Sequence, residues 1–161
     1  MNKIKDNIII FTTAYKDINR KKWNCYQRSN EEYIKGFYNL CSYINYKLIV
    51  YLEDDIKEII TKGKIFNENI FFISLKDVVT FYDKYLEKDK KIMETKEYQD
   101  KIPYYRKANP EHIYSEYNFI NHSKVNFIRH TKDLFPDYKF YAWIDFGTMN
   151  LEIENIPMYD A

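Results

Sequence analysis

Lys139-Phe140-Tyr141-Ala142-Trp143-Ile144-Asp145-Phe146-Gly147 lies near the end of the 161-residue sequence. Five consecutive apolar or aromatic residues, 140–144, predict a strand that is buried on both faces. The run stops at an acidic residue, Asp145. A carboxylate at the carboxyl end of a central strand lies where open α/β sheets bind their ligands. Asp145 is therefore the leading functional candidate.

Three further apolar runs predict strands over residues 8–13, 47–52 and 69–73. Helices are expected from Ser29 or Asn30 to Ile44, from Asp55 to Thr61, from about Lys76 to Lys101 and from about Glu111 to Phe135. The order βαβαβ, then helices, then β predicts a single α/β domain over residues 1–161, with a mostly parallel central sheet flanked by helices.

Three of these helices have an expected apolar face. The first carries Tyr33, Phe37, Leu40, Cys41 and Ile44, and the charged third one carries Phe81, Tyr82, Tyr85 and Leu86. On the last helix the apolar stripe comprises Ile113, Tyr117, Ile120, Phe127 and Ile128, with Lys124 among them. The simplest interpretation of Lys124 is a lysine whose charged end reaches solvent from the edge of the stripe.

Composition excludes several classes of protein. There are only three glycines, Gly36, Gly63 and Gly147, so neither a P-loop nor a glycine-rich dinucleotide fingerprint can form. The net charge of +1, with acids between the lysines, argues against a nucleic-acid partner. No apolar run approaches the roughly 20 residues of a transmembrane helix. We expect a cytoplasmic protein in which Cys25 and Cys41 are free thiols.

Parallel strands place their carboxyl ends at one edge of a sheet, so one rim is expected to carry Thr12, Thr13, Tyr15, Glu53, Asp54, Asp55, Ser74 and Asp145. Hydroxyl and carboxylate groups of this kind suit the hydroxyls of a nucleotide or a hard divalent cation. The same pattern also fits strand ends that are polar because they meet solvent, with Asp55 as a helix cap.

Other polar residues give weaker signals. Arg20 and Arg28 flank Trp23 and could clamp a phosphate or form ordinary surface ion pairs. His112, His122 and His130 lack zinc-site spacing and are interpreted as surface residues.

The sequence resembles the HtrL/YibB family in three segments that together cover nearly the whole chain. The first is residues 13–20, Thr-Ala-Tyr-Lys-Asp-Ile-Asn-Arg, followed by Trp23 and Arg28. The second comprises residues 109–111, 116–118 and 123–124, and the third is residues 143–147, Trp-Ile-Asp-Phe-Gly.

The resemblance implies a glycosyltransferase-like protein of the GT-A type, with a Rossmann-like half that binds a nucleotide-sugar donor. It would transfer the sugar to a glycan acceptor in polysaccharide or glycan synthesis. The implied nucleotide-sugar-binding residues are Thr12, Thr13, Tyr15, Arg20, Asn118 and Lys124. Asp145 would hold a divalent cation, Mn²⁺ or Mg²⁺, against the diphosphate.

Two features depart from the GT-A pattern. Such enzymes usually carry two acids two residues apart, and here Gly147 occupies the second place. Only residues 148–161 follow the motif, whereas the later half of a GT-A protein normally builds the acceptor site. The alternative function is therefore a truncated, non-catalytic donor-binding or interaction fragment that pairs with a separate C-terminal half.

Overall fold

The structure is a computed structural model, and it describes residues 8–23, 27–78, 80 and 82–149. Its elements, including five 3₁₀ helices, η1 to η5, are β1 (Ile9–Tyr15), η1 (Arg20–Lys22), α1 (Asn30–Tyr43), β2 (Lys47–Leu52), α2 (Asp54–Thr61), β3 (Ile70–Ser74), η2 (Leu75–Asp77), η3 (Tyr82–Lys84), α3 (Leu86–Met93), α4 (Lys96–Lys101), η4 (Tyr104–Arg106), η5 (Pro110–His112), α5 (Ser115–Leu134) and β4 (Phe140–Trp143).

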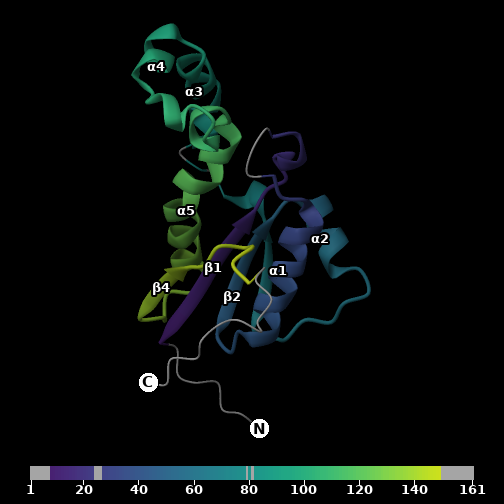
Figure 1. The fold of residues 1–161 in the computed structure, drawn as a ribbon. Coiled ribbons are helices and arrows are strands. Elements are labelled where there is room, and N and C mark those ends of the chain that lie inside the picture. The colour runs from purple at the N-terminus through teal and green to yellow at the C-terminus, as the bar shows by residue number, and fades with distance from the viewer. Residues whose placement is uncertain (1–7, 24–26, 79, 81, 150–161) are drawn as a thin grey trace, which may run out of the picture.

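The four strands form one sheet in the order β3-β2-β1-β4, and every neighbouring pair is parallel. All strands therefore deliver their carboxyl ends to the same edge, which lies at the top of the sheet in Figure 1. The predicted α/β fold with a parallel, helix-flanked sheet is confirmed, and it is consistent with a Rossmann-like fold.

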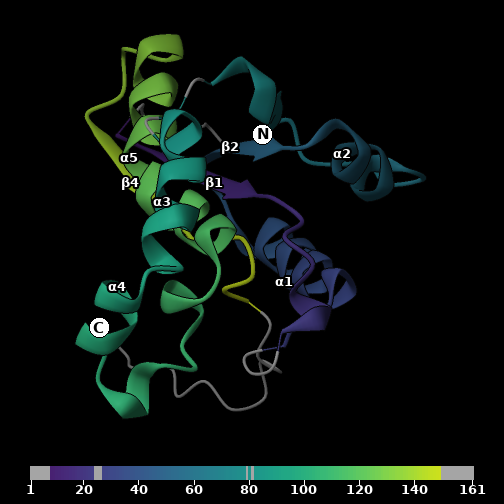
Figure 2. The ribbon, with the colours of Figure 1, turned by 90° about the horizontal axis from the view of Figure 1, so that it is seen from above.

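Helices cover both faces of the sheet, so the domain has three layers (Figures 1 and 2). Leu48, Val50 and Leu52 of β2 pack into the core beneath α1 and α2. Ile49 and Tyr51 point the opposite way, toward Phe127 of α5. This alternation follows from the two-residue period of a strand, and burial of both faces explains the continuous apolar run of β2.

The strand β4 is an edge strand, which corrects the prediction that it is central and buried on both faces. Within the described residues it pairs only with β1, and Phe140 is 62% exposed. Tyr141 and Trp143 pack on the α5 side of the sheet, and Ile144 packs on the α1 side. A run of five apolar residues, three of them aromatic, fits a half-buried edge strand as well as a central one, because aromatic side chains bury much area on one face.

The segment expected to be one helix from Lys76 to Lys101 is broken into η2, η3, α3 and α4. Thr80 and Asp83 bond each other, because the Thr80 hydroxyl donates to Asp83 Oδ2 (2.6 Å) and accepts from the Asp83 backbone N–H (3.2 Å). Such local bonds compete with a continuing helix. The predicted stripe does not form on one helix, since Tyr85 precedes α3 and is exposed, and Phe81 lies outside the described residues.

The helices α3 and α4 form an arm that extends beyond the carboxyl edge of the sheet and packs on the start of α5 (Figure 1). Lys90 of α3 pairs with Glu116 of α5 at 2.9 Å. One side of the carboxyl edge is therefore bounded by the arm and α5, and the other side is bounded by α1.

Candidate functional site

Two adjoining cavities lie at the carboxyl ends of β1 and β4. The first, about 490 Å³, is lined by Ala14, Tyr15, Lys16, Arg20, Arg28, Tyr33, Tyr117, Ile120, Asn121, Trp143, Asp145, Phe146, Gly147 and Thr148. The second, about 430 Å³, is lined by Arg20, Trp23, Gln27, Arg28, Tyr33, Asn109, Pro110, Glu111 and Tyr117. Because they share Arg20, Arg28, Tyr33 and Tyr117, we treat them as one site, the cleft. Each is large enough for part of a small-molecule ligand.

The loop after β1 is fixed by a chain of hydrogen bonds. The Tyr15 hydroxyl donates to Asn30 Oδ1 (2.6 Å), and Asn30 Nδ2 donates to Asp17 Oδ2 (2.6 Å). Asp17 Oδ1 accepts from the backbone N–H of Asn19 (2.8 Å), which adopts the left-handed conformation at φ 55°. Asparagine tolerates that conformation better than most residues. The loop thereby turns Arg20 back over the sheet edge.

Arg20 is 7% exposed and borders both cavities. Its guanidinium carbon lies 5.6 Å from the ring centres of Tyr15 and Trp23 and 4.7 Å from that of Tyr33. Its Nη1 donates to the Lys16 carbonyl (3.3 Å), whereas its buried Nε has no hydrogen-bond partner among the described residues. No carboxylate in the described part of the chain forms an ion pair with it.

The ring of Tyr33 holds a second guanidinium beside the first. Tyr33 belongs to the first turn of α1, where Ser29 accepts from the Glu32 N–H and Glu32 accepts from the Ser29 N–H in a capping box. The Arg28 guanidinium carbon lies 4.9 Å from the Tyr33 ring centre. Tyr33 therefore brings Arg20 and Arg28 together in the cleft through cation–π contacts.

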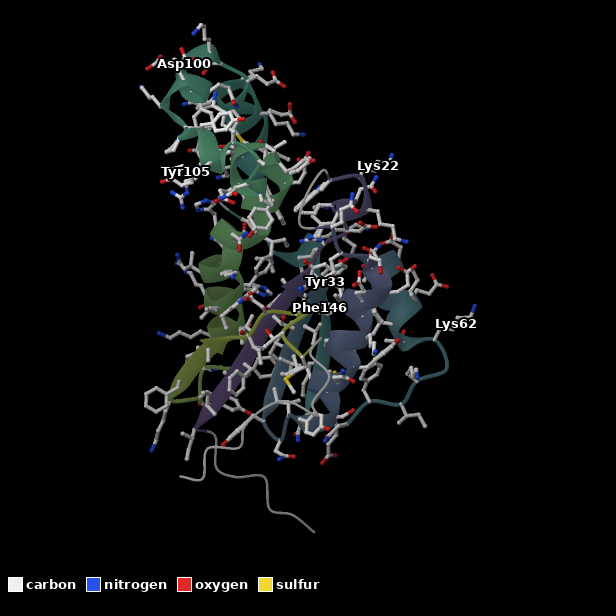
Figure 3. All side chains as sticks on the ribbon, viewed as in Figure 1. Lys22, Tyr33, Lys62, Asp100, Tyr105 and Phe146 are labelled. Atoms are coloured by element: carbon white, nitrogen blue, oxygen red, sulfur yellow. The ribbon has the colours of Figure 1, made fainter. Side chains whose placement is uncertain are left out.

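The segment after β4 crosses from the α5 side of the sheet to the α1 side, and Phe146 anchors it there. Phe146 is 3% exposed and stacks on Phe37 (4.5 Å between ring centres) and on Tyr15 (4.7 Å). Figure 3 shows Phe146 and Tyr33 close together at this crossing. A Cβ on Gly147 would lie 2.7 Å from Tyr33 Cδ1 and 3.3 Å from Arg28 Nη1, so this crossing requires glycine.

Asp145 lies at the cleft wall with its side chain 65% exposed. Its Oδ1 accepts from Lys124 Nζ (2.9 Å) and from Trp143 Nε1 (2.6 Å). Partial burial opposes ionisation, but the hydrogen bonds from Trp143 and Lys124 and the lysine charge outweigh it and hold the pKa of Asp145 below its usual range. Asp145 is therefore an ionised acid whose charge is balanced by Lys124.

The described residues offer a divalent cation no preformed set of ligands at this position. Mn²⁺ and Mg²⁺ prefer several oxygen ligands, but within these residues no three His, Cys, Asp or Glu side chains come together. Asp54 and Asp55, two other acids expected on the rim, follow β2, and the order of strands places β1 between them and β4. Asp54 is also paired with Lys76 at 2.6 Å.

The structure brings only part of the predicted nucleotide-sugar set to the cleft. Tyr15 and Arg20 line it, and Lys124 lies beside it through its bond to Asp145. Asn118 is buried, and its amide donates to the Glu111 carbonyl (3.1 Å). It does not line the cleft.

Thr12 and Thr13 were expected on the rim, and this expectation is corrected. The strand β1 continues to Tyr15, so both threonines lie inside the sheet and are fully buried. Thr12 Oγ1 donates to Thr131 Oγ1 of α5 (3.0 Å), and Thr13 Oγ1 has no hydrogen-bond partner within the described ranges. A pattern of apolar residues that ends in two threonines does not distinguish buried β-branched residues from exposed ones.

Two histidines also differ from the prediction of surface residues. His130 Nδ1 lies 2.9 Å from the hydroxyl of the buried Tyr51, and His112 Nδ1 lies 3.0 Å from the Tyr98 hydroxyl. Both imidazoles are half-buried and bonded to tyrosine. Neither borders the cleft.

The wall of the cleft formed by α5 was not identified from the sequence. Tyr117 and Ile120, assigned there to the core face of the helix, line the cleft instead. The core face of α5 comprises Ser115, Asn118, Phe119, Ser123, Phe127 and Thr131. A signal was present in Lys124, because a lysine within an apolar stripe is better placed beside a polar cleft than in a core.

The comparisons with known proteins give one match. The model of the family described as "Bacterial protein of unknown function (HtrL_YibB)" matches residues 6–160. Neither the curated proteins nor the solved structures give a match. In the described residues, no helix is long and apolar enough to cross a membrane. Since the match extends over nearly the whole sequence, the chain belongs to the HtrL_YibB family.

Proposed function

We propose that this protein binds a nucleotide-sugar donor in the cleft and takes part in glycosyl transfer to a glycan acceptor. The observation that carries the proposal is the composition of the cleft, which combines aromatic rings with guanidinium groups at the carboxyl edge of a parallel sheet. Aromatic rings suit a base or sugar face, and guanidinium groups suit phosphate oxygens.

The two cavities divide these features in a way that suits a long ligand. Arg20, Arg28 and Tyr33 lie where the cavities meet, which is a suitable position for the phosphates. Of the two tryptophans, Trp143 lines the first cavity and Trp23 lines the second. A nucleotide sugar has aromatic and hydroxyl-rich groups on opposite sides of a diphosphate and matches this order.

Asp145 is suited to contact hydroxyl groups of the sugar. Its Oδ1 is occupied by Lys124 and Trp143, and the residue remains exposed enough to accept a further hydrogen bond from a ligand. An ionised carboxylate is a strong acceptor for a hydroxyl. We assign to Asp145 a role in sugar binding, and transfer itself requires an acceptor that enters beside it.

Titration calorimetry of the full chain with UDP- and GDP-sugars, each in EDTA and in MnCl₂, tests the proposal. We expect saturable binding of at least one donor at millimolar concentration or below, weakened by Asp145→Ala. Asp133→Ala, which changes an exposed acid far along α5, is the control. No binding of any nucleotide sugar under both conditions would refute the proposal.

Donor binding without transfer is the second candidate function. It is favoured by the pairing of Asp145 with Lys124, because a paired carboxylate is a poor general base. Incubation of the protein with the best donor, with and without candidate glycans, distinguishes the two functions. Release of the nucleoside diphosphate indicates turnover, and binding with no release indicates a donor-binding protein.

A further inference from the structure

We infer that Arg20 and Arg28 form a diphosphate subsite that neutralises its ligand without a divalent cation. This inference deepens the proposed function and rests on it for the identity of the whole ligand. It concerns how the charge of the diphosphate is balanced, which the family match leaves open.

The first observation is an excess of positive charge in a buried place. Arg20 is 7% exposed and borders both cavities, and its Nε has no hydrogen-bond partner in the part of the chain that the structure describes. A buried charge is costly unless it is paired. The rings of Tyr15, Trp23 and Tyr33 offset part of that cost through cation–π contacts, but they leave its positive charge without a counter-ion in the described chain.

The second observation is that Arg28 joins Arg20 at the same ring. Their guanidinium carbons lie 4.9 and 4.7 Å from the Tyr33 ring centre. None of the ion pairs formed by the described residues includes either arginine. Two guanidinium groups at one position suit an anion that carries two charged phosphates, since each can bind phosphate oxygens with two parallel hydrogen bonds.

The third observation explains why a second acid is absent beside Asp145. The space that a side chain at position 147 would fill is taken by the Tyr33 ring and by Arg28 Nη1. An acid therefore cannot replace Gly147 without displacing Tyr33. The cation that neutralises a diphosphate here is a guanidinium of the protein, and Arg28 would repel a divalent metal ion at the same place.

Titration calorimetry with inorganic pyrophosphate in EDTA is the direct test. We expect wild-type protein to bind pyrophosphate in EDTA, at least tenfold more tightly than orthophosphate, and MnCl₂ to change the affinity less than threefold. Arg28→Gln should weaken binding at least tenfold, and Arg28→Lys should weaken it less. Arg129→Gln, an exposed change on α5, should leave the affinity unchanged.

The variants are chosen so that loss of folding cannot imitate the expected result. Arg28 is half-buried whereas Arg20 is buried, so Arg28→Gln is the deciding variant, with its thermal unfolding measured alongside. A folded Arg28→Gln protein with wild-type affinity overturns the inference. Absence of pyrophosphate binding by the wild type in EDTA also overturns it.

The same titrations separate this inference from the proposed function. Binding of pyrophosphate in EDTA with no binding of any nucleotide sugar refutes the proposed function and supports the subsite. Binding of nucleotide sugars only in MnCl₂, with no response to Arg28→Gln, supports the proposed function and overturns the subsite.

Discussion

The carboxyl edge of the sheet has two halves that balance charge in different ways. Beyond β2, the acids are paired with lysines or bonded to the backbone. Glu53 pairs with Lys16, Asp54 pairs with Lys76, and Asp55 accepts from the backbone N–H of Ile56. Beyond β1 and β4, Arg20 and Arg28 stack against aromatic rings and form no ion pair with a described residue.

The comparison shows that polar strand ends are not all alike in function. The half beyond β2 is satisfied by the chain itself, as is usual where strand ends meet solvent, and it contributes no acid to the cleft. The half beyond β1 and β4 has positive charge that the described chain does not neutralise. An external anion therefore has a place in one half and none in the other.

The largest expected effect comes from removing the Phe146 ring, which anchors the segment after β4 at the sheet edge. Phe146→Ala deletes a buried ring stacked on Phe37 and Tyr15. It should lower the free energy of unfolding by about 3–5 kcal/mol, as measured by urea denaturation.

Phe140→Ala is the matched control because it removes the same side chain from the other end of the same segment, where it is 62% exposed. It should change stability by no more than about 0.5 kcal/mol. Equal losses in the two variants would mean that the chain does not cross the sheet edge at Phe146, and the contrast between the two halves would fail.

A smaller loss of stability is expected from Gly147→Ala. The new Cβ would lie 2.7 Å from Tyr33 Cδ1, so the ring must move, at a cost of about 1–3 kcal/mol. Since Tyr33 holds both guanidinium groups, the variant should also weaken pyrophosphate binding.

A double-mutant cycle with Tyr33→Ala sharpens this result. In the Tyr33→Ala background the ring is gone, so adding Gly147→Ala should cost much less, with a coupling energy of about 1 kcal/mol or more in urea denaturation. Additive effects would show that Gly147 is needed for another reason than contact with Tyr33.

How far the sequence predicts this molecule depends on the range of the interactions involved. The bounds of β2 were predicted correctly, and α1 begins after Ser29 as expected, because a continuous apolar run and a capping box are local signals. The single helix predicted from about residue 76 to 101 is wrong, because the chain is interrupted where Thr80 and Asp83 bond each other locally.

The candidate site was predicted in part for the same reason. Tyr15 ends β1, Arg20 and Asp145 follow strands, and strand order alone places all three at one edge. The pairing of Tyr33 with Gly147 joins residues more than a hundred positions apart and depends on the crossing at Phe146. The stripe on α5 was assigned to the core because apolar periodicity is the same for a helix that faces a core and one that faces an aromatic cleft.

A modest gain in pyrophosphate affinity is expected from breaking the ion pair between Glu53 and Lys16. Glu53→Gln removes the partner of Lys16, which lines the cleft. The released charge should tighten pyrophosphate binding by about two- to fivefold, since an exposed or half-exposed charge pair is worth about 1 kcal/mol or less. Calorimetry at low ionic strength measures the change.

Asp54→Asn is the matched control, because it releases Lys76, which does not line the cleft. Its pyrophosphate affinity should equal that of the wild type. An equal gain in both variants would indicate a diffuse effect of net charge in place of a defined subsite.

The smallest effect concerns Asp145, the acid after β4 that is paired with Lys124. Carboxyl NMR should give Asp145 a pKa below the usual value of about 3.9, and Lys124→Met should raise it, with Lys132→Met as an exposed control.

Because the pKa of Asp145 is lower in the folded state, the ion pair stabilises the protein above the unfolded-state pKa, and this stabilisation is lost as the pH falls through the folded-state pKa. The stability change is expected below about 1 kcal/mol, since the carboxylate is largely exposed. If the pKa of Asp145 is unchanged in Lys124→Met, Lys124 does not balance its charge, and Asp145 regains its candidacy as a metal ligand.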